Sequence, residues 1–200
     1  MLIHVAMVLV LLQSCNNSAK NKTPDPVKHV PLENQVAEKQ RFFPVTTYIK
    51  GQLFEITQKG ITPLKYSTIN GHTDSVWLKT ENFTQAFSEF LHPEIDSANL
   101  ISLFTEKKFM DQTIDAFTFT YDPAGVLPDS MTLNHWDVYI DPASGKVRRI
   151  YMVKNIGENK TIQLTWQGDK WCKTIYIITN PDGTSTVEKE EKITWSFDIQ

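Results

Sequence analysis

The chain is poor in cysteine, glycine and clustered basic residues. Its 200 residues include 2 cysteines and 8 glycines, and the formal net charge is −3. Binding of nucleic acid phosphates needs grouped lysine and arginine side chains, and the densest arginine pair here is Arg148–Arg149. That pair is expected to point to both faces of a strand. The composition therefore predicts that nucleic acid is not a partner.

Signatures of metal sites and of acyl transfer are also missing from the sequence. No two of the 5 histidines stand two to four positions apart, and H-E-x-x-H, Cys-x-x-Cys, G-x-S-x-G and Ser-x-x-Lys do not occur. A glycine-rich phosphate loop is absent too, because Gly145-Lys146 lacks the earlier glycine and the following Ser or Thr of that motif. The sequence therefore predicts no bound metal and no cofactor.

Pairs of carboxylates leave one catalytic interpretation open. Asp137 with Asp141, or Asp111 with Asp115, could serve as acid and base on either side of a glycosidic bond. The structural interpretation is that Asp141 closes a turn and Asp137 lies on a strand face, while Asp111 and Asp115 straddle two elements. The structural interpretation is favoured. We therefore expect a protein that is not an enzyme, with a carbohydrate-active enzyme as the less favoured alternative.

An unusually apolar run, Leu2–Leu12, stands at the N-terminus and is interrupted only by His4. A helix of this length rises about 16 Å, roughly half the hydrocarbon core of a bilayer, so the run is too short for a transmembrane helix. It is typical of the hydrophobic region of a signal peptide.

The residues that follow, Leu12, Gln13, Ser14 and Cys15, resemble the lipobox of bacterial lipoproteins. That box has an aliphatic residue three positions before the cysteine and a small residue directly before it. The resemblance implies that residues 1–14 are removed as a signal peptide. It also implies that Cys15 carries diacylglycerol on its thiol and a further acyl group, such as palmitate, on its amino group. Two or three acyl chains would hold the protein on a membrane almost permanently.

Residues 15–40 are expected to form the lipidated cysteine and a disordered tether. The segment after Cys15 is polar, contains three prolines and shows little apolar periodicity. Lipoproteins of the Bacteroidota that reach the cell surface resemble one another in having acidic residues just after the cysteine, and residues 16–20 have none. Asn16 also differs from the aspartate that retains enterobacterial lipoproteins in the inner membrane. The expected location is the outer membrane, facing the periplasm, with the cell surface as the alternative.

Helical periodicity is confined to the first half of the remaining chain. Pro44 is expected to start a helix with one apolar stripe, which Gly60 ends. Thr80 is a reasonable N-cap for a second helix that closes at His92-Pro93. A short third helix is expected around Ser97–Phe104. Between the first two helices, Asn70-Gly71 is a strong signal for a β-hairpin formed by residues 64–69 and 73–78.

From Ile114 onward, short alternating runs separated by turn residues indicate a β meander. A two-residue turn at Gly168-Asp169 would pair Trp166 with Trp171 on one face of the sheet and Thr165 with Cys172 on the other. Cys172 is expected to be a quiet, half-buried thiol. The charged side chains of the last strand favour a position at an edge of the sheet.

These patterns predict an α+β fold in a single domain that covers residues 41–200. The expected architecture is a curved antiparallel sheet, a meander of about 6–8 strands, packed on its inner face with two or three helices from the N-terminal half. The stretch Trp136–Ile150, WDVYIDPASGKVRRI, looks like the strand-turn-strand of PepSY-type modules. That resemblance covers fifteen residues and has low specificity, because D-P-x-x-G-K is a common hairpin turn.

Five tryptophans are candidates for lining a ligand pocket: Trp77, Trp136, Trp166, Trp171 and Trp195. At alternating strand positions the same residues could equally form the core. The favoured function is a membrane-anchored envelope lipoprotein with a non-catalytic binding or structural domain, whose partner is an envelope protein or the cell wall. The alternative is a carrier of a lipid or small apolar ligand in a half-barrel pocket, since the expected architecture is similar to that of outer-membrane lipoprotein carriers.

Three short segments are similar to the D-[S/T]-aliphatic acceptor for O-glycosylation in Bacteroidota: Asp74-Ser75-Val76, Asp96-Ser97-Ala98 and Asp129-Ser130-Met131. The resemblance implies modification of Ser75, Ser97 and Ser130 after export. The alternative is that Asp-Ser pairs occur here because they suit turns.

Overall fold

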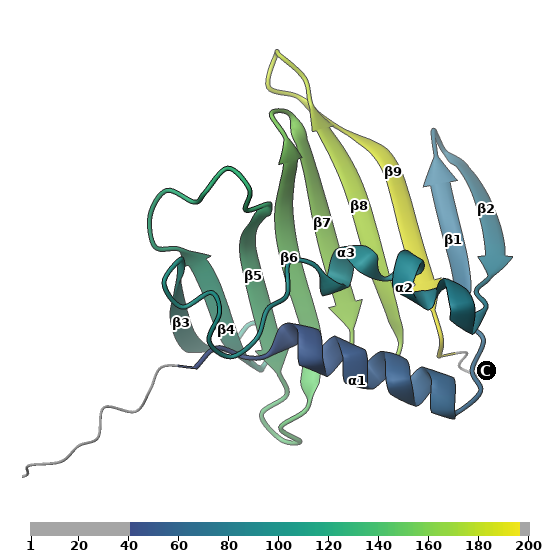
Figure 1. Cartoon of the computed structure of the whole chain (residues 1–200), viewed down its shortest axis with the longest axis horizontal. Helices are drawn as coiled ribbons and strands as arrows, with labels where there is room; N and C mark the ends of the chain where they lie inside the picture. Colours follow the sequence, from purple (N-terminus) through teal and green to yellow (C-terminus); the bar gives the residue numbers. More distant parts are fainter. Residues whose placement is uncertain (1–40, 197–200) are drawn as a thin grey trace, which may run out of the picture. The chain divides into compact units, whose positions relative to one another are not determined.

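The computed structural model describes residues 41–196 (Figure 1). The predicted signal peptide, Cys15 and the tether lie outside the described residues. In the described part, nine strands form one antiparallel sheet in the order β2-β1-β9-β8-β7-β6-β5-β4-β3. The strands are β1 (Leu64–Ile69), β2 (His72–Trp77), β3 (Phe104–Asp111), β4 (Ala116–Pro123), β5 (Leu133–Ile140), β6 (Val147–Gly157), β7 (Lys160–Gln167), β8 (Trp171–Thr179) and β9 (Ser185–Thr194). The helices are α1 (Val45–Gln58), the 3₁₀ helix η1 (Thr80–Asn82), α2 (Phe83–Ala86) and α3 (Ser88–Leu91).

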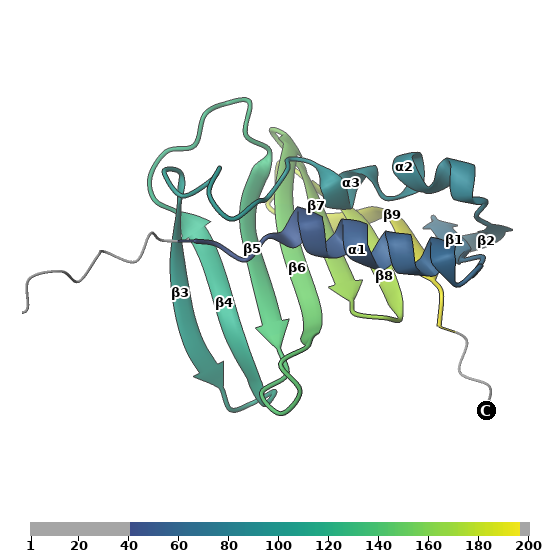
Figure 2. The same ribbon diagram turned by 60° about the horizontal axis from the view of Figure 1, so that its bottom comes forward.

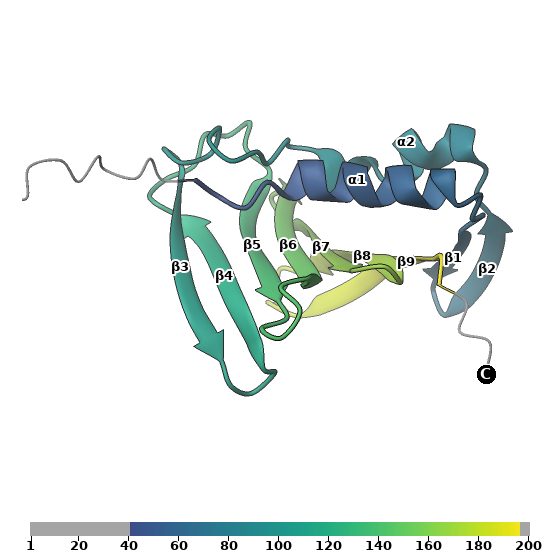
Figure 3. The same ribbon diagram turned by 90° about the horizontal axis from the view of Figure 1, so that it is seen from below.

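The predicted α+β class with a curved antiparallel sheet is confirmed, although the sheet has nine strands instead of 6–8. Strands β3 to β9 follow one another in chain order as a meander, and the β1–β2 hairpin is added beside β9. Figures 2 and 3 show that the helices all lie over one face of this sheet. We call this helix-covered side the inner face and the opposite side the outer face.

Helix α1 forms where its apolar stripe predicts it. Val45, Ile49 and Ile56 are buried against the sheet. Gly60 ends the helix with a φ of 64°, a left-handed conformation that glycine adopts without a steric cost. On the same helix the buried Thr46 accepts a hydrogen bond from the backbone N–H of Ile95 at 2.8 Å, which ties α1 to the segment after α3.

The second predicted helix is present but is broken into η1, α2 and α3. The break falls at Phe87, whose φ of −107° and ψ of 8° depart from helical values. Phe83, Phe87 and Phe90 are all buried, as the predicted apolar face requires. The ring of Phe87 lies 5.8 Å from that of Trp166 and 6.3 Å from that of Trp195. The residue at which the helix is interrupted, Phe87, is therefore also the residue whose ring packs against the two tryptophans.

The third predicted helix, around Ser97–Phe104, is wrong. Residues before β3 form turns, in which the Asp96 carboxylate accepts hydrogen bonds from the backbone N–H groups of Ala98 and Asn99. Such side-chain bonds compete with helical backbone bonds. Phe104 instead begins β3, a strand that the sequence did not predict. This strand lies at an edge of the sheet.

The predicted register between β7 and β8 is also wrong, by one residue. Trp166 pairs with Cys172 and Gln167 pairs with Trp171. The connecting loop contains three residues, 168–170, and Asp169 adopts a positive φ of 58°. A one-residue slip moves every side chain of β8 to the opposite face. Cys172 is consequently in the core, and Trp171 lies on the outer face.

Strand β9 does not lie at an edge as predicted. It sits between β1 and β8, and the edges are β2 and β3. The pairing of β9 with β1 joins Leu64 to Thr194 across most of the domain sequence. A pairing between such distant segments leaves no local pattern in the chain.

The inner face has two unlike halves. In one half, aromatic side chains from β3, β4, β5 and β7 fill the space between the helices and the sheet. Trp136 stacks on Tyr121 with ring centroids 4.4 Å apart, and the ring of Phe104 meets Trp136 edge-on at 4.7 Å. In the neighbouring half, Cys172 and Ile193 are buried in the core, and the rest of the inner face of β1, β8 and β9 carries mainly polar and charged side chains.

Candidate binding site

An open groove lies over the polar half of the inner face. Its volume is about 510 Å³, which falls in the range of small-molecule sites, about 300–1,000 Å³. Its floor comes from β1, β2, β8 and β9, and its opposite wall comes from η1, α2 and α3. The lining residues are predominantly polar: Lys65, Ser67, Val76, Leu78, Asn82, Gln85, Ala86, Ser88, Glu89, Thr174, Tyr176, Lys189 and Glu191.

The floor of this groove holds an ion-paired triad. The ammonium of Lys65 lies 2.7 Å from the Glu191 carboxylate, and the ammonium of Lys189 lies 2.8 Å from the same carboxylate oxygen. The Glu191 side chain is 15% exposed and the Lys65 side chain is 21% exposed, so both charges are largely withdrawn from water. Burial alone would raise the pKa of Glu191, but its bonds to Lys189 and Lys65 outweigh burial and lower the pKa. Glu191 is therefore a carboxylate at neutral pH.

A second buried charge fixes the helical wall of the groove. The side chain of Lys154 on β6 is 3% exposed, and its ammonium donates to the carboxylate of Glu89 at 3.0 Å. It also donates to the backbone carbonyls of Glu89 and His92. These three bonds use all the donors of the ammonium group. Lys154 thus attaches α3, which carries Ser88 and Glu89 of the wall, to the sheet.

A larger groove of about 530 Å³ runs beside α1 and includes Phe43, Tyr48, Glu55 and Lys59. Its charged residues differ from those of the triad, because the side chains of Lys59 and Glu55 are 64% and 56% exposed. Solvated charges of this kind are ordinary on a helix surface. The groove over β1, β8 and β9 is therefore the stronger candidate.

The structure does not bring the five predicted pocket tryptophans together. Trp136 and Trp166 are fully buried in the aromatic packing, and Trp195 is 5% exposed beside Trp166 with centroids 4.9 Å apart. Trp171 lies on the outer face under the ammonium of Lys192, and Trp77 on β2 is 57% exposed. The buried indole N–H groups of Trp136 and Trp166 have no hydrogen-bond partner among residues 41–196. Trp136, Trp166 and Trp195 therefore belong to the hydrophobic core of the domain.

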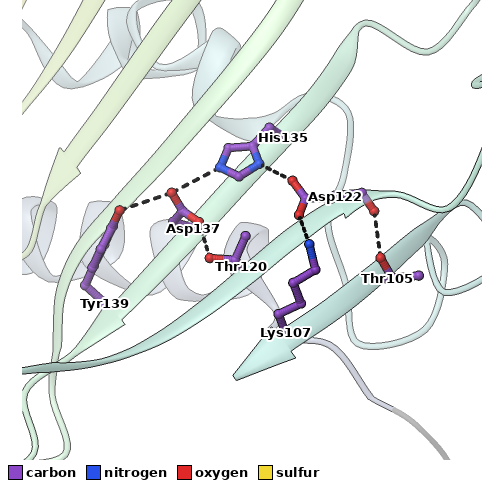
Figure 4. A network of polar contacts seen from close by, with 7 residues as sticks. All are labelled: Thr105, Lys107, Thr120, Asp122, His135, Asp137 and Tyr139. Atoms are coloured by element: carbon purple, nitrogen blue, oxygen red, sulfur yellow. Dashed lines mark hydrogen bonds and ion pairs between the residues drawn. The ribbon is translucent and has the colours of Figure 1, made fainter. Parts of the chain in front are cut away.

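The outer face carries a second polar cluster, around His135 (Figure 4). One ring nitrogen of His135 lies 2.9 Å from Asp122 and the other lies 3.1 Å from Asp137. Asp137 also accepts hydrogen bonds from Thr120 at 2.7 Å and from Tyr139 at 3.1 Å. The second oxygen of Asp122 pairs with the ammonium of Lys107 at 2.9 Å. We call this set the His135 network.

Every carboxylate oxygen of the His135 network is bonded to a neighbouring side chain. The hydrogen bond to Asp137 raises the pKa of His135 above its ordinary value, although burial opposes the shift. Lys107 lowers the pKa of Asp122. Burial would raise the pKa of Asp137, but the bonds from His135 and Thr120 lower it. Each ring nitrogen of His135 thus faces a carboxylate, which favours the doubly protonated imidazolium, and the network joins β3, β4 and β5.

The stabilisation from the His135 network depends on pH. Because the folded-state pKa of His135 is raised, its contribution is fully present below the ordinary value of 6.5 and is lost as pH rises through the raised pKa. The lowered pKa values of Asp122 and Asp137 make their contribution disappear as pH falls below 3.8. We predict that His135→Gln lowers the free energy of unfolding by about 1–3 kcal/mol at pH 5.5, and by less at pH 9. Urea denaturation across this pH range measures the difference.

His72→Gln is the matched control for this prediction. The His72 side chain is 82% exposed and lies 3.6 Å from an equally exposed Asp74, so its replacement is expected to change stability by less than about 0.5 kcal/mol at every pH. A His135→Gln effect that stays constant or grows between pH 5.5 and pH 9 would contradict the assigned protonation.

Asp141 and Asp111, two of the other predicted carboxylates, are bonded to residues of their own turns. Asp141 accepts hydrogen bonds from the backbone and hydroxyl of Ser144 and from Arg148, and the Ser144 bonds chiefly lower its pKa to about 2. Asp111 binds Thr113 in the β3–β4 turn. Asp115 lies in the same turn with a positive φ of 48°.

Other candidate residues fall in different parts of the described domain. Ser75 and Ser130 are exposed and Ser97 is partly exposed. Cys172 is buried instead of half-buried, and burial raises the pKa of its thiol well above the ordinary value. Within residues 41–196 no group of His, Cys, Asp or Glu side chains is arranged to hold a metal ion.

Comparison with known proteins gives no relative. No protein family, curated protein or solved structure matches the chain. In the part of the chain that the structure describes, no helix is both long and apolar enough to span a membrane.

Sequence reasoning did not identify the groove. A signal was nevertheless present, because Lys65 and Ser67 alternate along β1, and Lys189 and Glu191 alternate along β9. Each pair occupies positions that point to one face of its strand. The alternation does not tell which face of the sheet the helices cover, so the sequence could not place these residues on the inner face.

Proposed function

We propose that this chain is a bacterial envelope lipoprotein, anchored through acylated Cys15 to the outer membrane and facing the periplasm. Its domain is a non-catalytic binding module that takes a small polar ligand, or a polar segment of an envelope partner, in the groove over β1, β8 and β9. The observation that carries the binding role is the Lys65–Glu191–Lys189 triad, held mostly out of water on the floor of a 510 Å³ groove.

Energetics support a functional reason for this triad. Withdrawing charged groups from water costs several kcal/mol per ion before any pairing, and apolar residues of similar size are often at least as stable. The other half of the same inner face is filled with aromatic side chains, such as Trp136 and Trp166. Apolar side chains can therefore fill the space between the helices and the sheet in this fold. Charges retained beside an open groove are better explained by recognition than by stability.

The character of the groove favours a polar ligand over an acyl chain. Most of its lining residues are polar, and the two glutamates among them are already paired with lysines. The aromatic residues that could line an apolar pocket contact one another at centroid distances of 4.4–4.9 Å. Neither the groove nor the His135 network contains a nucleophile beside a free base, which supports a binding role instead of catalysis.

The anchor is tested by replacing Cys15 with serine. The full chain is expected to lose incorporation of labelled palmitate and to leave the membrane fraction, because serine has no thiol to acylate. Cys172→Ser is the matched control, since this thiol is buried in the core and retains no role in anchoring. A Cys15→Ser protein that is still processed and recovered with membranes would exclude the lipoprotein proposal.

The binding role is tested by native mass spectrometry of the full chain purified from its own envelope. The wild-type protein is expected to carry a bound ligand mass that Ser67→Trp removes, because a tryptophan at residue 67 would fill the groove. Thr68→Trp is the matched control, since Thr68 is the next residue of β1 and points to the outer face. Equal ligand occupancy in the two variants, or none in the wild-type protein, would count against a groove site.

A further inference from the structure

We infer that the ligand of this groove is anionic, with a carboxylate or phosphate group bound between the ammonium groups of Lys65 and Lys189. This inference rests on the proposed function of the same groove and specifies the chemistry of its ligand. Three observations support an anionic ligand: the charges of the groove, its unused hydrogen-bond donors and the protonation of the neighbouring Tyr176 hydroxyl group.

The charges of the groove do not balance. Glu89 on the wall is paired with Lys154, whose remaining donors go to backbone carbonyls, so this pair is neutral and complete. The single carboxylate of Glu191 is shared by two lysines, Lys65 and Lys189. Among the lining residues of the floor, two ammonium groups therefore meet one carboxylate, which leaves an excess of one positive charge there. Asp74 stands opposite Ser67 on β2, but its side chain is 85% exposed and lies outside the lining. A ligand that supplies one negative charge would neutralise the excess charge of the floor.

Hydrogen-bond donors are in excess at the same place. An ammonium group carries three N–H donors and no acceptor. Within the described residues, Glu191 is the only carboxylate paired with Lys65, and Glu191 is likewise the only one paired with Lys189. The ammonium of Lys189 also lies 5.4 Å from the ring centroid of Tyr176, which places it against the β8 side of the groove. Both lysines therefore have N–H donors left for an oxygen anion.

The neighbouring hydroxyl group is a donor as well. Burial, together with the carboxylates of Glu191 and Glu89, raises the pKa of Tyr176 to about 12. Tyr176 is consequently neutral at physiological pH and can donate its O–H. Ser67 and Thr174 add hydroxyl groups to the floor between the strands. A donor-rich surface with one excess positive charge suits an anion and disfavours a cation.

The experiment is isothermal titration of the full chain with two probes, inorganic phosphate and acetate, at low ionic strength. Binding of at least one probe is expected, and raising the salt concentration should weaken it because the interaction is electrostatic. Lys189→Gln is expected to weaken binding by about tenfold or more, since a charge-assisted hydrogen bond is worth roughly one decade in affinity. Lys65→Gln should act in the same direction.

Lys192→Gln is the matched control, because Lys192 is on the same strand but lies over Trp171 on the outer face. It should change affinity by less than about twofold. The Lys189 side chain is 34% exposed, so Lys189→Gln is expected to fold. This variant therefore tests the inference even if Lys65→Gln does not fold. Tighter binding of phosphate or of acetate tells which anion source fits the groove. A preference for either anion supports the inference, provided that Lys189→Gln weakens the binding of that anion.

The possible failures are distinguishable. If neither anion binds but native mass spectrometry finds a neutral ligand that Ser67→Trp removes, the anionic assignment is overturned and the groove remains a binding site. If Lys189→Gln and Lys192→Gln weaken anion binding equally, the lysine assignment is overturned. Absence of anion binding together with absence of any ligand in the groove would overturn both proposals.

Discussion

Replacing Trp136 with alanine is expected to lower the free energy of unfolding by about 3–5 kcal/mol, the usual cost of removing a large aromatic side chain from a core. Trp136 is fully buried and stacks on Tyr121 with an interplanar angle of 9°. The rings of Phe104 and Phe42 meet it edge-on at 4.7 and 6.0 Å. The cavity left by the indole would be bordered by strands and by the start of α1, which cannot collapse into it easily.

Urea denaturation followed by far-UV circular dichroism measures this loss. Phe54→Ala is the matched control, because Phe54 lies on α1 with 64% of its surface exposed and should change stability by less than about 0.5 kcal/mol. Comparable small losses for both variants would mean that the aromatic half of the inner face is not closed as described.

The second large effect is expected for Lys154→Ala, which should lower the free energy of unfolding by roughly 3 kcal/mol. The backbone carbonyls of Glu89 in α3 and of His92 directly after it would lose their donor, and the loss of a charge-assisted hydrogen bond costs about 1.5–3 kcal/mol. The Glu89 side chain is 41% exposed, so it can be rehydrated and adds little to the cost. Alanine also removes the buried alkyl chain of the lysine.

Lys160→Ala on β7 is the control for this second effect. Its ion pair with Glu188 is about half exposed on both sides, and its removal should cost less than about 1 kcal/mol. The same comparison tests the groove, because α3 forms part of its wall. Hydrogen exchange should show faster exchange of the α2–α3 backbone amides in Lys154→Ala than in Lys160→Ala. Unchanged exchange in that segment would contradict the anchoring role of Lys154.

Elements with strong local signals could be predicted from the sequence. The apolar stripe and terminal glycine of α1 predict its course, and Asn70-Gly71 predicts the first hairpin, in which both turn residues have positive φ. The meander from β4 onward follows from alternation and turn residues. In each case the information lies within about twenty residues of chain.

The errors arose where distant or subtle interactions decide the structure. Strand β3 has the charged sequence Glu106-Lys107-Lys108 in its middle, which suits an edge but hides the strand pattern. The loop after Gln167 has three residues instead of two, and this difference sends Trp171 to the outer face. The pairing of β9 with β1 requires the complete domain and has no local signature.

The candidate site was harder to predict for the same reason. Its floor combines Lys65 from β1 with Glu191 from β9, and these strands become neighbours only through the long-range pairing. Its wall depends on Lys154 reaching α3 from β6. By contrast, His135, Asp137 and Tyr139 of the His135 network alternate along one strand, a pattern visible in the sequence, whereas the network's other members Asp122, Thr120 and Lys107 come from neighbouring strands.

The inner face is closed where Trp136 and Trp166 pack and is open over β1, β8 and β9. Nuclear magnetic resonance of the full chain, with inorganic phosphate and palmitate as separate probes, distinguishes these two regions. We predict that phosphate shifts the backbone amide signals of Ser67, Thr174 and Glu191, and that palmitate leaves the indole signals of Trp136 and Trp166 unmoved. If palmitate moves the two indole signals and phosphate leaves the groove amides unaffected, the ligand site lies among the tryptophans and not over β1, β8 and β9.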